Sequence, residues 1–219
     1  MDSHPSVRGY AQFQLVKGSA FDLREFYCVA LRHPTTSDLR PAILGVGETG
    51  NSSDVSLIIP YLTHEAPRTR KSALRTLARL NPQAFVSVFR QSLSDSSPGV
   101  SREAMKGLCK NLHLLAGEDL WTVFATNTEI HVFRNVLFLI ARLGKWESIG
   151  YLVNAVGTEN EKVRQLAEIY IRRWSAHFNS SFATPTTTQR ERINSALHRT
   201  GTILDSGVLR QIEYGLRSL

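Results

Sequence analysis

Basic side chains recur at helical spacing in three successive segments of the chain, and they are the residues best suited to bind a ligand. Residues four apart lie on one side of an α-helix, so each segment would place its cations along one face. These residues are Lys71, Arg75, Arg79, Arg102, Lys106, Lys110, Arg134 and Arg142. Like charges at this spacing repel one another, and we expect no acidic neighbours interleaved with them. The pattern favours an anionic partner, and its alternative is a solvated face that serves solubility.

Two kinds of anion would suit such a face. The carboxylates of an acidic protein segment would pair with the cations, and the phosphates of DNA or RNA would bind with release of counterions. Phe138 is the only aromatic residue between the first and last cation of each of these three segments, so stacking on single-stranded bases is not favoured. We expect an acidic protein partner, with a nucleic acid as the alternative.

The distribution of charge along the chain agrees with this expectation. The 219 residues include 26 basic and 19 acidic ones, which gives a net charge of +7. The segment from Arg68 to Lys110 holds nine basic residues against two acidic ones, so it contains the whole excess. The hydrophobic content of 42% excludes a disordered or collagen-like chain.

Cysteine usage and hydropathy predict a cytoplasmic protein without a membrane partner. Cys28 and Cys109 stand alone in apolar stretches, as is typical of small core residues in a reducing compartment. The longest purely apolar run, residues 136–141, is far shorter than the ~20 residues of a membrane-spanning helix. Residues 1–5 lack the basic and apolar regions of a signal peptide.

Residues that could perform catalysis form only weak patterns. Cys109 and His113 are expected on one helix face, but no third residue has the spacing of a metal ligand. Glu118, Asp119 and Trp121 are best explained as the capping acids and core aromatic of a helix start. We therefore predict no catalytic residue, cofactor or metal site.

An internal repeat of about 31 residues sets the positions of these side chains. Aliphatic or small residues recur at one position of successive repeats, which we call a column, with steps of 31, 31, 31, 32 and 31 residues. They are Ala11, Ala42, Ala73, Ala104, Val136 and Ala167. A second column upstream has the same period, at Tyr27, Ile58, Phe89, Leu120 and Leu152. The single extra residue must fall between Phe124 and Val136, in the polar stretch 126–129, where a loop tolerates insertion.

Each repeat has the pattern of two helices joined by a turn. Apolar residues follow the helical period in segments such as 68–80 and, upstream, 55–62, and breakers such as Pro67 and Pro98 separate the segments. One such hairpin cannot bury both of its apolar stripes alone, but stacked neighbours can. The sequence predicts an all-α protein that is a right-handed α-solenoid with capping helices at its C-terminal end.

Three fragments resemble the Val-Arg-x-x-Ala start of the second helix in HEAT-like repeats of the short type: residues 7–11, 69–73 and 163–167. Residues 43–50 resemble the Leu-Gly-x-x-Gly ending of that family, and the resemblance covers about residues 5–175. It implies an interaction scaffold whose second helices line a concave face, and a few members bind nucleic acid there. A hydroxylase branch with similar repeats holds iron with several His-Glu pairs, whereas this chain has only His64-Glu65.

The predicted domain organisation has three parts. Residues 1–178 form the solenoid, the Ser/Thr-rich segment 179–188 is a linker or mobile loop, and 189–219 form a helical cap. Two amphipathic helices are expected in the cap, over 189–199 and 208–216.

The start of the chain and the edge of the core give two further expectations. Residues 5–15 match a second helix without its preceding partner, so the chain either belongs to a longer solenoid or begins with a polar cap. Arg8, Arg70 and Arg164 lie at the edge of the apolar stripe, where we expect them to bond across repeats.

The function expected from these observations is a non-catalytic scaffold that binds an acidic protein through its basic concave face. The alternative is a nucleic-acid-binding protein that uses the same face, including the helical-repeat type of DNA repair protein.

Overall fold

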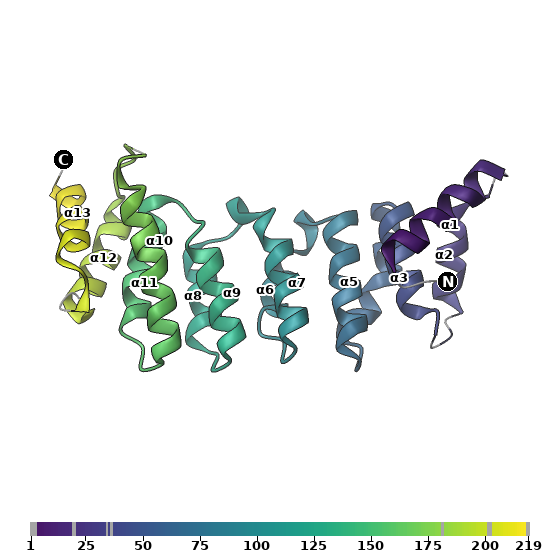
Figure 1. The fold of residues 1–219 in the computed structure, drawn as a ribbon, viewed down its shortest axis with the longest axis horizontal. Helices are drawn as coiled ribbons and strands as arrows, with labels where there is room; N and C mark the ends of the chain where they lie inside the picture. Colours follow the sequence, from purple (N-terminus) through teal and green to yellow (C-terminus); the bar gives the residue numbers. More distant parts are fainter. Residues whose placement is uncertain are drawn as a thin grey trace. The chain divides into compact units, whose positions relative to one another are not determined.

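The protein is all-helical, as the sequence predicts. The computed structural model describes residues 4–18, 21–33, 35, 37–180, 182–200 and 203–217, and every regular element within these ranges is a helix. The chain divides into two compact units, Met1–Asn111 and Leu112–Leu219, and each has its own core. The two units are described separately below (Figure 1).

The first unit contains seven α-helices and three short 3-10 helices within its described residues. In chain order they are α1 (Pro5–Gly18), α2 (Leu23–Arg32), α3 (Leu39–Thr49), η1 (Ser52–Asp54), α4 (Val55–Ile58), η2 (Ile59–Thr63), α5 (Pro67–Leu80), η3 (Gln83–Phe85), α6 (Val86–Ser92) and α7 (Pro98–Cys109). Pro67 and Pro98 are the first residues of α5 and α7, where the missing N–H costs no hydrogen bond.

Helices of the first unit pair as hairpins. Helix α2 packs against α3, α4 and η2 pack against α5, and α6 packs against α7. The second helices of successive hairpins also pack on one another, α3 on α5 and α5 on α7, and Figure 1 shows α5 and α7 as neighbouring upright helices. Residues one period apart are therefore neighbours in this unit.

The predicted small-residue column forms the seam between these helices. Ala42, Ala73 and Ala104 are completely buried. Gly107, three residues after Ala104, packs directly against the ring of Phe89. A Cβ at this glycine would lie 2.8 Å from the Phe89 Cδ1. The lack of a side chain on the second helix thus allows the aromatic residue of the first helix to pack closely.

Ion pairs link successive hairpins of the first unit at the edge of the core. The Arg70 guanidinium donates two hydrogen bonds of 2.8 Å to the carboxylate of Asp95, in the turn before α7. Arg8 reaches from α1 to Glu48 on α3, with hydrogen bonds of 2.6 and 2.7 Å. The prediction that these two arginines bond across repeats is therefore confirmed.

Helix α1 departs from the predicted pattern. Ala11 is exposed rather than buried, and Tyr10 and Phe13 are 68% and 59% exposed. Polar bonds tie this helix to its neighbours: besides the Arg8 pair, the Gln12 amide donates to Tyr27 and Glu48 at 3.3 and 3.1 Å. The expectation that Ala11 continues the buried column is wrong, because α1 is held by polar groups and not by an apolar seam.

The second unit contains six α-helices and two short 3-10 helices within its described residues. In chain order they are η4 (Leu112–Leu114), α8 (Gly117–Ala125), α9 (Ile130–Ile140), α10 (Lys145–Val156), α11 (Glu161–Ala176), η5 (Phe178–Ser180), α12 (Thr187–Thr200) and α13 (Ser206–Arg217). The predicted insertion falls in the connection between α8 and α9, and the two cap helices occur where they were expected.

Packing in the second unit follows the same hairpin rule. Helix α8 packs against α9, α10 against α11, and α9 against α11, with Val136 and Ala167 completely buried. Helix α12 then packs on α10, and α13 on α11. Arg164 differs from its counterparts in the first unit, because its ion pair is with Glu161 of its own helix. The expected bond across repeats is therefore wrong for Arg164.

Residues 182–186 have no regular secondary structure, whereas residues 179–180 of the predicted linker belong to η5 and residues 187–188 to α12. None of the helices within the described ranges is long and apolar enough to cross a membrane.

Candidate anion-binding sites

Six of the predicted cations belong to α5, to α7 or to the residue just after α7, and we call this set the α5–α7 face. Its members are Lys71, Arg75, Arg79, Arg102, Lys106 and Lys110. The Arg75 and Lys106 nitrogens lie 3.0 and 3.6 Å from the same oxygen of Glu103. Cations 31 residues apart in the sequence thus meet at one point, as the repeat predicts.

An acidic side chain at the centre of this face corrects the expectation that no acid is interleaved. The Glu103 side chain is only 8% exposed and accepts hydrogen bonds from the Arg75 Nε and Nη2 at 3.1 and 3.0 Å. Burial acts to raise the pKa of Glu103, but the hydrogen bonds and charge of Arg75, with the charges of Lys106 and Lys71, lower it overall. Arg75 is therefore engaged in holding α5 to α7.

A second carboxylate, Glu48 of α3, lies at the other edge of the face. It accepts from Arg8 and Gln12, and the Arg79 Nη1 lies 3.4 Å from its Oε1. Burial acts to raise the pKa of Glu48, while the hydrogen bond and charge of Arg8, followed by Gln12 and Arg79, lower it overall. Arg79 is thus partly neutralised.

Three cations of the α5–α7 face remain available to a partner. Among the described residues, no carboxylate lies within ion-pair distance of Lys71, Arg102 or Lys110. Arg102 and Lys110 are exposed. Lys71 of α5 is half-buried, because its Cδ lies close to Gly99 in the first turn of α7. The available charge on this face is half of what the sequence suggests.

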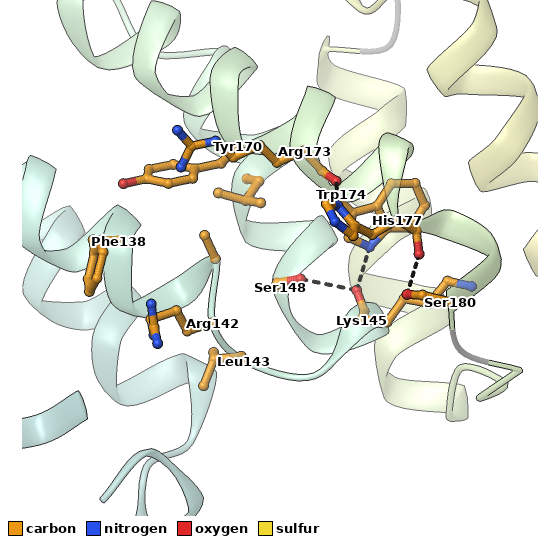
Figure 2. A pocket seen from close by; sticks show the side chains of 12 residues that line it. Phe138, Arg142, Leu143, Lys145, Ser148, Tyr170, Arg173, Trp174, His177 and Ser180 are labelled. Atoms are coloured by element: carbon orange, nitrogen blue, oxygen red, sulfur yellow. Dashed lines mark hydrogen bonds between the residues drawn. The ribbon is translucent and has the colours of Figure 1, made fainter. Parts of the chain in front are cut away.

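The remaining two predicted residues lie in the second unit, Arg134 on α9 and Arg142 in the turn just after it. Both are exposed, and the Arg142 guanidinium lies 5.1 Å from the centre of the Phe138 ring, in a cation–π arrangement. Phe138 and Arg142 border a cavity of about 320 Å³. Figure 2 shows that α11 contributes Tyr170, Arg173 and Trp174 to the same cavity.

Tyr170, Lys145 and Trp174 are site residues that the sequence reasoning missed. The Trp174 indole donates to the Lys145 carbonyl at 2.8 Å, and the Lys145 ammonium donates to the Phe178 carbonyl at 2.6 Å. Burial lowers the pKa of Lys145. These bonds join the start of α10 to the end of α11 and fix that wall of the cavity.

Arg173 had a signal in the sequence. It stands in the same repeat column as Arg79, Lys110 and Arg142, but the apolar Ile169 four residues earlier breaks the basic pattern of its helix. The repeat column predicts a shared surface better than the spacing within one helix does.

The residues considered for catalysis do not form a reactive site. Helix α7 ends at Cys109 and His113 lies in η4, so the expected shared helix face is wrong. Glu118 and Asp119 occupy the first turn of α8, and Glu118 accepts a hydrogen bond of 3.1 Å from the Tyr151 hydroxyl. Among the residues that the structure describes, no three His, Cys, Asp or Glu side chains are grouped to hold a metal ion.

Comparison with known proteins adds no further constraint. No protein-family model and no curated protein sequence matches the chain.

Proposed function

We propose that the chain is a non-catalytic scaffold of the HEAT-like type, a right-handed α-solenoid whose α5–α7 face binds an acidic protein segment. The hairpin pairing within each unit and the 31-residue period support this architecture. Lys71, Arg102 and Lys110 are the cations that would pair with the partner. By the repeat, Arg134 and Arg142 are the equivalent cations of the next hairpin.

The carboxylates within the face favour an acidic protein over a nucleic acid. Duplex DNA carries one charge about every 1.7 Å, so its phosphates would also lie against Glu103 and Glu48. A peptide can space its acidic side chains and donate backbone N–H groups where the face presents a carboxylate. The Arg75–Glu103–Lys106 cluster is the single observation that carries this choice.

The proposal is tested by titrating the full chain with a fluorescent acidic peptide and following anisotropy. A variant that combines Lys71→Ala, Arg102→Ala and Lys110→Ala is expected to weaken binding by about tenfold, because it removes the unpaired cations. A matched control removes three cations elsewhere, Arg32, Arg172 and Arg217, each of which pairs within its own helix. Equal affinities of the two triple variants would refute the assignment of this face.

A nucleic-acid arm decides between the two partners. With about three free cations, duplex binding would show a slope of log affinity against log salt near −3. A duplex that binds the unmodified chain more tightly than the peptide, and loses affinity in the α5–α7 triple variant, would favour the nucleic-acid alternative. The proposal expects the reverse order.

A further inference from the structure

The cavity of the second unit has a lining that is positive and aromatic. Its wall includes Arg142, Lys145, Arg173 and His177 together with Phe138, Tyr170 and Trp174, and none of the described residues that line it is acidic. All of these residues come from the segment 138–180, so the site lies within one compact unit. Its volume of about 320 Å³ is at the lower end of the range for small-molecule sites.

Two guanidinium groups of this wall rest on aromatic rings and make no ion pair among the described residues. Arg142 lies over Phe138 at 5.1 Å, and Arg173 lies over Tyr170 at 5.6 Å, measured to the ring centres. Figure 2 shows the Arg173 guanidinium against the Tyr170 ring and the Arg142 guanidinium near the Phe138 ring. A stacked guanidinium keeps its N–H edge available, so both groups can still bind an anion.

Tyr170 lies among the basic side chains of this wall, with its ring under Arg173. Burial raises the pKa of Tyr170, whereas the charges of Arg173, Arg134 and Arg142 act in the opposite direction. Two guanidiniums in a wall whose described residues include no carboxylate form a surrounding that attracts an anion of more than one charge.

We propose that this cavity binds a phosphate monoester carried on a flat ring, with its phosphate held by Arg142 and Arg173 beside Tyr170. The planar guanidinium fork matches the oxygens of a phosphate, and the ester has close to two negative charges at neutral pH. The rings of Phe138 and Trp174 give the carrier an apolar surface. A nucleoside monophosphate has this size and chemistry.

The site shares Arg142 with the basic residues of the scaffold proposal, but it uses none of the α5–α7 cations, so the two proposals can be tested separately. A failure of peptide binding by the Lys71/Arg102/Lys110 triple variant would leave it intact. Loss of ligand binding in an Arg173→Ala variant would likewise leave the scaffold proposal intact.

The test uses adenosine monophosphate as the probe, with adenosine and inorganic phosphate as separate arms. Binding to the full chain is measured by calorimetry and by Trp fluorescence, because Trp174 lines the cavity whereas Trp121 and Trp146 do not. The monophosphate is expected to bind more tightly than inorganic phosphate, and adenosine to show no saturation up to about 10 mM. Equal binding of inorganic phosphate and the monophosphate would overturn the ring requirement, and absence of monophosphate binding would overturn the site.

Adjacent arginines on α11 supply a matched pair of variants. Arg173→Ala is expected to weaken binding of the monophosphate by about 10- to 100-fold, because it removes charge-assisted hydrogen bonds. Arg172→Ala removes the same charge from the same helix but from a side chain paired with Glu168, so binding should not change. Tyr170→Phe keeps the ring under Arg173 and should weaken binding less. Equal effects of Arg173→Ala and Arg172→Ala would contradict the assignment.

Discussion

The two units use equivalent helix positions for different purposes. In the first unit, Arg75 on α5 meets Glu103, the residue just before the buried Ala104 of α7. In the second unit, the residues before the buried Val136 and Ala167 are Asn135 and Leu166, which carry no charge. Two cations of this unit, Arg142 just after α9 and Arg173 on α11, lie over aromatic rings instead. A neighbour one repeat away thus decides whether a basic side chain holds helices together or remains available to a ligand.

The largest expected contrast between the units is in stability. Arg75→Ala would leave the buried Glu103 with only Lys106 at 3.6 Å, so we expect a loss of about 2–3 kcal/mol in the free energy of unfolding. Arg142→Ala removes an exposed cation over a ring and should cost no more than about 0.5–1 kcal/mol. Urea unfolding of both variants measures the difference. Equal losses would show that the Arg75–Glu103 pair has no structural role.

A smaller contrast is expected on acidification. Arg24 lowers the pKa of Asp54 by a hydrogen bond that outweighs the effect of burial, and the pKa values of Glu48 and Glu103 are also lowered. All three residues belong to the first unit. Because each pKa is lower in the folded state, its contribution to stability is complete above the ordinary carboxyl pKa, about 4, and is lost as pH falls through the folded value.

Hydrogen exchange at pH 7 and at about pH 3 measures this loss helix by helix. Peptides from α3, α5 and α7 are expected to lose more protection than peptides from α9 and α11. A larger loss in the second unit would contradict the role given to the three carboxylates.

The smallest expected effect concerns the affinity of the α5–α7 face. Glu103→Gln removes the central negative charge but keeps a side chain of the same shape, so binding of an acidic peptide should tighten by about threefold. Glu65→Gln is the matched control, because Glu65 is exposed in the turn before α5. If Glu103→Gln weakens peptide binding, the carboxylate itself contributes to recognition.

Much of the fold could be predicted from the repeat. Apolar residues at a fixed period must be buried at equivalent places, and Ile58, Phe89, Leu120 and Leu152 are all at most 1% exposed. The exception is α1, where Ala11 matches the column but lies exposed. Periodicity shows which face of a helix is apolar, but only the three-dimensional structure shows whether another helix covers that face.

The candidate sites could be predicted only in part. Spacing along one helix identified the cations of α5 and α7, but it could not show that Glu103 turns toward Arg75, because they are 28 residues apart. It also missed Tyr170, which follows the apolar Ile169 and becomes part of a charged site only because Arg173 lies over its ring and Arg142 lines the same cavity. Pairings between helices decide which charges are free.

Arginine side-chain NMR tests this difference between the units most directly. The Nε–H signals of the full chain are recorded with and without adenosine monophosphate. The Arg75 Nε–H donates to Glu103, so its signal should be protected from exchange and unchanged by the ligand. The signals of Arg142 and Arg173 should exchange rapidly in the free protein and shift on titration. A ligand-dependent shift at Arg75, with none at Arg142 and Arg173, would contradict the account.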